Sequence, residues 1–309
     1  MAARINVGAA IGAGFGLIAR RPVSVLAWGL APILLQVAEL WVLAPYFLSD
    51  LSQIAQTASA GAPPPALADP MRALQMQALS QLFNLIALAL GAIVYCAVWR
   101  AVLQPAKKSF ASMRVGMPEL FIALLSFGFG IALVVAMFVV MVPALLVIGI
   151  VGGVSQNPAI GFAVALPVAL AVFLIGGAYL ALRFAFVGPM MVADSKFHLF
   201  DSWSATRGHV GSLFLVGLGV VGVVLVVELV VMTVIVGAGA AFVISSGDPS
   251  KLGQTLLRSP GAALTALWPY AAAALALLVP ITGVLTAIGA APWARAYQDL
   301  LPDQSEVFA

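Results

Sequence analysis

The stretch that decides the fold is a run without any charged residue, from 120 to 182: LFIALLSFGFGIALVVAMFVVMVPALLVIGIVGGVSQNPAIGFAVALPVALAVFLIGGAYLAL. Glu119 precedes it and Arg183 follows it. An α-helix rises about 1.5 Å per residue, so about 20 apolar residues cross a hydrocarbon core of about 30 Å. The run is too long for one crossing, and the turn-forming sequence GGVSQNP (152–158) divides it. It therefore predicts a hairpin of two transmembrane helices.

The composition of the whole chain points to a membrane protein. Of its 309 residues, 63% are hydrophobic and 8% are charged, which is too little charge to cover the surface of a soluble protein of this length. The cationic residues lie in short clusters between apolar runs, a distribution that excludes a basic nucleic-acid-binding face. A single cysteine, Cys96, excludes an internal disulfide framework, and we expect it to pack as a small apolar residue.

Six apolar runs predict an all-α bundle that forms one polytopic membrane domain over residues 1–309. The expected spans lie near 23–48, 79–103, 120–150, 158–187, 213–243 and 263–291. Before the first span, Gly8, Gly12 and Gly16 form a ladder of small residues four apart, a pattern that favours close helix packing in lipid. We expect residues 1–20 to form an amphipathic or re-entrant N-terminal helix at the membrane surface.

The distribution of lysine and arginine predicts the orientation. If the N-terminus is cytoplasmic, the cytoplasmic side holds eleven cationic residues and the opposite side three. The eleven are Arg4, Arg20, Arg21, Arg100, Lys107, Lys108, Arg114, Arg183, Lys196, Arg207 and Arg295, and the three are Arg72, Lys251 and Arg258. Because cytoplasmic loops carry the excess of Lys and Arg, both termini are expected in the cytoplasm.

Two carboxylates within apolar runs are the candidate intramembrane polar site. Glu228 lies near the middle of the fifth run, and Glu39 lies in the outer part of the first. A carboxylate at this depth costs several kcal/mol unless it is protonated or has a partner, so we expect Glu228 to face the bundle interior. It could be a proton or cation site, a gating contact, or a protonated carboxyl bonded to a neighbouring helix.

Basic residues at the expected cytoplasmic ends of the spans are candidate contacts to anionic lipid head groups. Each would contribute about 1 kcal/mol near a negative membrane surface. They are Arg20, Arg21, Arg100, Lys107, Lys108, Arg183, Lys196 and Arg207.

The polar segment 195–206 predicts one interfacial helix. His198 and Asp201 are three residues apart on one side of it, and Phe197, Phe200 and Trp203 lie on the other. A His–carboxylate pair could act as a general base or bind a metal, but the sequence shows no third member and no HExxH, GxSxG or Cys–His arrangement. We therefore predict no catalytic residue, metal site or cofactor. The GxGxxG letters at 217–222 lie inside an apolar run, where they favour helix packing over dinucleotide binding.

Two stretches carry a family resemblance. AVWRAVLQPAKKSFASMRVGMPEL (97–120) and LRFAFVGPMMVADSKFHLFDSWSATRGHVGSLF (182–214) resemble a family of uncharacterised bacterial multi-pass membrane proteins. The second is also similar to the membrane domain attached to some bacterial glycerophosphodiester phosphodiesterases. The resemblance implies an inner-membrane location and an envelope or lipid-related role, and it supplies no catalytic residues. Its motif residues here are Arg183, Pro189, Trp203, Thr206, Arg207 and Gly208.

These observations lead to two functional hypotheses. The first is a non-enzymatic bacterial inner-membrane protein that acts in envelope or lipid-associated organisation, or as a partner subunit. Its partners would be the lipid bilayer with its anionic head groups, and a second membrane protein or copy held through glycine-rich faces. The alternative is a transporter or channel for a proton, cation or small solute that uses Glu228.

Overall fold

The structure is a computed structural model that describes residues 4–59, 70–105, 110–245 and 260–301. These residues form helices and no strand, which confirms the all-α prediction. The helices are α1 Val7–Arg20, α2 Pro22–Ser59, α3 Pro70–Leu103, η1 Phe110–Ser112, α4 Met117–Val154, α5 Pro158–Arg183, α6 Val187–Asp194, α7 Asp201–Ala205, α8 Val210–Ser245 and α10 Pro260–Asp299.

The protein is a multi-pass membrane protein. Within the described ranges, six helices are long and apolar enough to cross a membrane: α2, α3, α4, α5, α8 and α10. Five of the expected spans fall inside these helices, but the range 158–187 runs past the end of α5 at Arg183. The Ser202 hydroxyl explains this break, because it donates to Arg183 O at 2.9 Å and accepts from Phe186 N at 3.2 Å. Two backbone groups at the break thus bond to a side chain.

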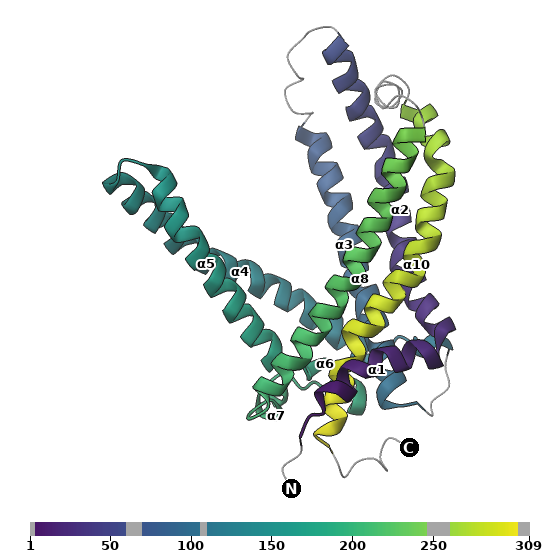
Figure 1. Ribbon diagram of the computed structural model, residues 1–309, viewed down its shortest axis with the longest axis vertical. Helices are drawn as coiled ribbons and strands as arrows, with labels where there is room; N and C mark the ends of the chain where they lie inside the picture. Colours follow the sequence, from purple (N-terminus) through teal and green to yellow (C-terminus); the bar gives the residue numbers. More distant parts are fainter. Residues whose placement is uncertain (1–3, 60–69, 106–109, 246–259, 302–309) are drawn as a thin grey trace.

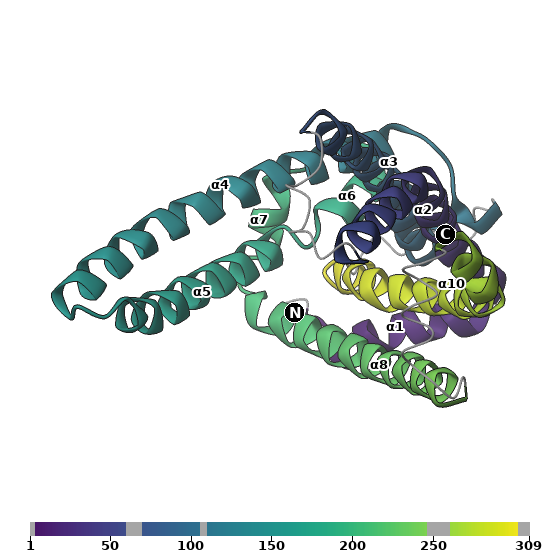
Figure 2. The same ribbon diagram turned by 90° about the horizontal axis from the view of Figure 1, so that it is seen from above.

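The six long helices form a bundle and a separate hairpin. Figure 1 shows α2, α3, α8 and α10 running in similar directions, while α4 and α5 lean away from them as a pair. Seen from above, α4 and α5 lie side by side and diverge from the bundle near α3 and α6 (Figure 2). The short helices α1, α6 and α7 gather at the end where α10 finishes (Figure 1).

The hairpin turn lies where GGVSQNP predicted it. The Asn157 side chain caps α5 by accepting from Ala159 N at 3.0 Å. Gly161 then lets α5 approach α4, since a Cβ at this position would lie 2.5 Å from Ile148 O. Beyond this contact the hairpin packs through Ala144, Ala165 and Ala169.

Two glycines set the crossing of α2 and α10. A Cβ on Gly29 would lie 1.9 Å from Val279 O, and a Cβ on Gly283 would lie 2.0 Å from Val25 O. Real Cβ atoms essentially never approach other atoms within 3.0 Å. The two helix backbones are therefore in direct contact, the kind of packing that small residues allow in lipid.

The close packing of α1 uses a different face from the one expected. Gly14 meets α10, where an added Cβ would lie 2.9 Å from Ile288 Cα, and Ala10 and Leu17 are buried beside it. Added Cβ atoms on Gly12 and Gly16 would meet nothing within 4 Å. Within the described part of the chain the Gly8–Gly12–Gly16 ladder therefore makes no close contact with another helix, and a contact with a second chain stays a prediction. Spacing by four occurs on every face of a helix, and the face that packs against α10 carries Ala10, Gly14 and Leu17.

Candidate functional site

The two intramembrane carboxylates lie on different helices and do not form one site. Glu228 is exposed on α8 and has no hydrogen bond or ion pair within the described part of the chain. The expectation that Glu228 faces the bundle interior is therefore wrong for the single chain. Glu39 is half-buried on α2, where its Oε1 accepts from Ser80 Oγ of α3 at 3.4 Å. The desolvation cost of the Glu228 carboxylate is avoided by protonation or by a partner, and this chain need not supply the partner.

Arg100 is buried and does not reach lipid head groups. Its side chain pairs with Glu119 at the start of α4, and the two residues are 6% and 3% exposed. Arg100 Nη1 also donates to Ser112 O at 3.3 Å. The prediction of a head-group contact is wrong for Arg100, because the α3–α4 connection folds back over it.

That connection is held by residues far apart in the sequence. Trp28 Nε1 donates to Ala111 O at 2.8 Å, and Arg21 donates to Ser112 Oγ at 3.2 Å and to Pro105 O at 2.9 Å. Ala111 and Ser112 both have positive φ, 49° and 56°, so this short turn is a strained one for residues with a Cβ. The hydrogen bonds from Trp28, Arg21 and Arg100 hold the turn in this strained conformation.

Arg183 is enclosed by aromatic rings at the elbow between α5 and α8. Its guanidinium carbon lies 5.2 Å from the Tyr179 ring centroid and 5.0 Å from the Trp203 ring centroid, both within cation–π range. Its Nε and Nη2 donate to Tyr179 Oη at 3.1 and 3.0 Å, and its Nη1 donates to Thr206 Oγ1 at 3.5 Å. Three motif residues, Arg183, Trp203 and Thr206, therefore form one structural cluster.

The other motif residues shape the same elbow. Pro189 is fully buried in α6, and Gly208 has a φ of +79° in the turn that leads into α8. Glycine adopts this conformation without steric cost. Arg207 is exposed beside it.

Arg20, Lys196 and Arg207 are exposed, as a head-group contact requires. Lys107 and Lys108 lie outside the described residues.

The expected interfacial helix 195–206 is not one helix. Ser195 has a left-handed φ of 62° and ends α6, and α7 begins only at Asp201. His198 lies between the two helices, with Nδ1 2.5 Å from Asp201 Oδ2 and Nε2 2.5 Å from Asp194 Oδ2. Asp194 is thus a third member beside the His198–Asp201 pair, and the break at Ser195 brings it into reach. The described residues hold no His/Cys/Asp/Glu group suited to a metal.

The hydrogen bond to Asp201 raises the pKa of His198 above its ordinary value, partial burial opposes the rise, and Asp194 adds to it. Because the pKa is higher in the folded state, protonated His198 stabilises the protein. This stabilisation is complete at pH values below the unfolded pKa of 6.5 and is lost as the pH rises through the folded pKa.

We expect the difference in thermal midpoint between the wild type and His198→Gln to shrink as pH rises from about 6 to about 9. A difference that stays constant over this range would contradict the charged bridge.

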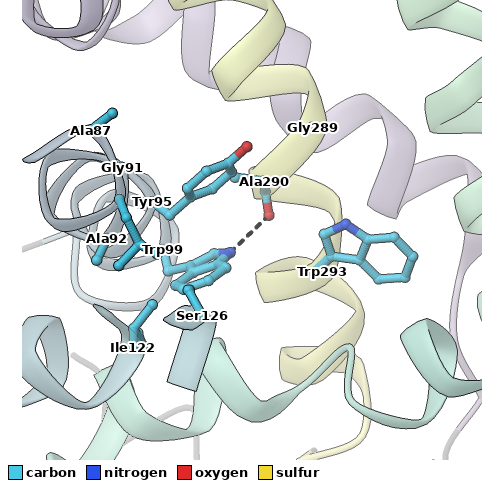
Figure 3. A pocket seen from close by; sticks show the side chains of 11 residues that line it. Ala87, Gly91, Ala92, Tyr95, Trp99, Ile122, Ser126, Gly289, Ala290 and Trp293 are labelled. Carbon is cyan, nitrogen blue, oxygen red and sulfur yellow. Dashed lines mark hydrogen bonds between the residues drawn. The ribbon is translucent and has the colours of Figure 1, made fainter. Parts of the chain in front are cut away.

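A cleft lies where the hairpin diverges from the bundle. It has a volume of about 540 Å³ and is lined by Ala87, Leu88, Gly91, Ala92, Tyr95 and Trp99 of α3, Ile122 and Ser126 of α4, and Gly289, Ala290 and Trp293 of α10. Figure 3 shows Tyr95 and Trp99 between α3 and α10, with Trp99 Nε1 donating to Ala290 O at 3.0 Å. Because Tyr95 is 45% exposed and Ser126 is exposed, the cleft is open to the surroundings of the protein. We call it the aromatic cleft.

The packing around Trp99 fixes one wall of the aromatic cleft. Gly188 of α6 lies against the Trp99 ring, so closely that an added Cβ would be 2.2 Å from Cη2. The Tyr95 and Trp99 ring centroids are 5.9 Å apart. On the opposite wall Trp293 extends to α8, where a Cβ on Gly217 would lie 3.4 Å from its Cη2. In the sequence these residues give no sign of a cleft, since a tryptophan beside an arginine at a helix end is typical of simple interface anchoring.

The aromatic cleft has the lining of a site for an apolar molecule. Its lining includes no charged residue, histidine or cysteine. The polar atoms on its walls are the Tyr95 and Ser126 hydroxyls and the indole nitrogens, of which Trp99 Nε1 is already bonded. The volume lies within the range of about 300–1,000 Å³ that is usual for small-molecule sites.

Comparison of the chain with protein-family models, with curated proteins and with solved structures finds no match.

Proposed function

We propose that this chain is a non-enzymatic protein of a bacterial inner membrane that binds a bilayer lipid in the aromatic cleft and acts in lipid-associated organisation of the envelope. The observation that carries the proposal is the open, uncharged cleft at the branch between α3, α4 and α10. Both termini would be cytoplasmic, in keeping with the excess of cationic residues counted for that side.

The shape of the aromatic cleft suits an acyl chain. Its lining on α3 extends from Trp99 to Ala87, roughly 18 Å at the helical rise of 1.5 Å per residue. Trp99 and Trp293 lie beside Arg100 and Arg295, close to the ends of their helices, and tryptophans prefer the level of the lipid head groups. An acyl chain that enters between Trp99 and Trp293 would run along Gly91 toward Ala87. Its contacts with the cleft would replace the contacts that it makes with neighbouring lipids in the bilayer.

The hairpin supports the same proposal and leaves room for a membrane partner. Its helices expose apolar side chains over most of their length, so lipid has to surround them. An added Cβ would also meet nothing within 4 Å at Gly128, Gly130, Gly149, Gly153, Gly176 and Gly177. These open glycines fit the proposed contact with a second membrane protein or copy.

Transport through Glu228 draws no support from the geometry. The carboxylate is on the exposed side of α8, and Glu39 bonds to Ser80 on another helix pair. We therefore favour lipid binding.

Gly91→Leu is expected to block the aromatic cleft without disturbing the fold, because an added Cβ at Gly91 meets nothing within 4 Å. The protein would be reconstituted in vesicles that contain a phospholipid with a photoreactive acyl chain, and the label on α3 and α10 peptides would be quantified. A loss of about 1 kcal/mol in contacts corresponds to roughly fivefold less label.

Gly222→Leu is the matched control, since Gly222 on α8 has equally open surroundings. It should label as the wild type does. Equal labelling of cleft peptides in Gly91→Leu and the wild type would refute lipid binding in the cleft.

A further inference from the structure

A second cavity lies at the end of the molecule where α1 crosses α3 and α10. Its volume is about 520 Å³, and none of the residues that line the aromatic cleft lines it. Arg20 and Arg21 reach it from the end of α1, and Arg295 and Gln298 reach it from the last turns of α10. We call it the arginine pocket.

The arginine pocket carries an excess of positive charge. Arg295 Nη2 pairs with Asp299 Oδ1 at 3.2 Å, and Arg295 Nη1 donates to Gln298 Oε1 at 3.4 Å. Among the residues that the structure describes, Arg21 donates to the uncharged Ser112 Oγ and Pro105 O alone. Arg20 is exposed and has no hydrogen bond or ion pair with the described residues. Three guanidinium groups thus line the pocket, and among the described residues only that of Arg295 pairs with a carboxylate. Most of their donors remain available because each group has five N–H bonds.

The glycine ladder of α1 provides the space in this pocket. Gly12 and Gly16 line it, and an added Cβ on either would meet nothing within 4 Å. Side chains at these positions would extend into the cavity and fill part of it. The ladder therefore leaves a concave surface beside the arginines, whereas Gly14 on another face makes the contact with α10.

We infer that the arginine pocket binds a phosphate group of a larger molecule. Guanidinium groups match phosphate oxygens with two parallel, charge-assisted hydrogen bonds, and several arginines around one concave site are typical of phosphate recognition. The volume exceeds what a single phosphate needs, so the rest of the ligand occupies the space over Gly12 and Gly16. A phospholipid head group and a soluble phosphorylated compound share this chemistry. The inference rests on residues that the proposed acyl-chain site does not use.

The test uses the full chain in detergent and two probes. Inorganic phosphate would be added at constant ionic strength against chloride while the thermal midpoint is recorded. In parallel, native mass spectrometry would count retained phosphatidylglycerol and phosphatidylcholine. Arg20→Gln and Arg295→Gln remove charge from the pocket, and Gly16→Leu fills it without changing charge. Losing one charge-assisted hydrogen bond of about 1.5 kcal/mol weakens binding roughly tenfold.

Arg114→Gln is the charge control, because Arg114 is exposed between η1 and α4 and does not line the pocket. Preferential retention of phosphatidylglycerol that all three pocket variants lose, and Arg114→Gln keeps, identifies a lipid head group. A rise in midpoint with phosphate alone, lost in the same variants, identifies a soluble ligand. No response to either probe, or an equal loss in Arg114→Gln, overturns the inference. Gly91→Leu should lower the retention of both lipids alike and leave the preference for phosphatidylglycerol and the response to phosphate unchanged, which separates this result from the lipid site in the aromatic cleft.

Discussion

Gly283→Ala is expected to abolish the packed fold in detergent. The new methyl group would lie 2.0 Å from Val25 O, a backbone atom that cannot rotate away, so α2 and α10 must separate by more than an ångström. The separation also loosens buried Trp28, and with it the bond to Ala111 O. Overpacking of this severity costs at least about 3 kcal/mol. The measurement is the thermal midpoint together with the size-exclusion profile of the purified protein.

Gly222→Ala provides the comparison for this prediction. Glycine to alanine inside a helix gains up to about 1 kcal/mol of intrinsic helix propensity, and at Gly222 no atom lies within 4 Å of the new methyl group. We expect Gly222→Ala to match or exceed the wild-type midpoint. A Gly283→Ala protein as stable as Gly222→Ala would show that the close α2–α10 crossing is absent.

The second large effect is expected from separating Arg100 and Glu119. Both are almost fully buried, so Arg100→Met or Glu119→Leu alone leaves one charge in an apolar environment without its partner. Breaking a buried pair in this way costs about 3–5 kcal/mol of unfolding free energy. Arg100→Met also removes the bond to Ser112 O and should loosen the turn between α3 and α4.

The double variant Arg100→Met/Glu119→Leu makes this prediction specific. It leaves no unpaired charge, and apolar replacement of a complete buried pair is often close to neutral. Its loss of stability should therefore be smaller than the loss in either single variant. Losses that simply add would mean that the two side chains do not depend on each other.

The positions of the long helices could be predicted from the sequence, because each helix follows from a local run of apolar residues. A run such as 120–182 has one stable arrangement in a bilayer, and GGVSQNP marks the turn within it. Glu119 and Arg100 were harder to interpret, because a charge at the end of an apolar run suggests an interface. Their burial depends on how the connection between α3 and α4 folds back, which involves Arg21 and Trp28 from another helix.

The candidate sites could not be predicted in full for the same reason, because they are formed by contacts between residues far apart in the sequence. The His198–Asp201 spacing was visible in the sequence, but Asp194 joins them only because Ser195 ends α6 in a left-handed conformation. Neither cavity has a local motif. Tyr95, Trp99 and Trp293 come together from two helices, and Arg20 meets Arg295 only because α1 folds across the end of α10. Periodicity defines the faces of a helix but does not say which face a neighbour will cover.

The hairpin links the shape of this protein to the thickness of its membrane. The 38 residues of α4 extend roughly 57 Å, nearly twice the depth of a hydrocarbon core of about 30 Å. An apolar rod of that length must lie at a slant, as α4 and α5 do relative to the bundle (Figure 1). A thinner bilayer would press the hairpin flatter and a thicker one would let it stand more upright. The aromatic cleft is at the vertex of this angle, so bilayer thickness would set how widely its entrance opens.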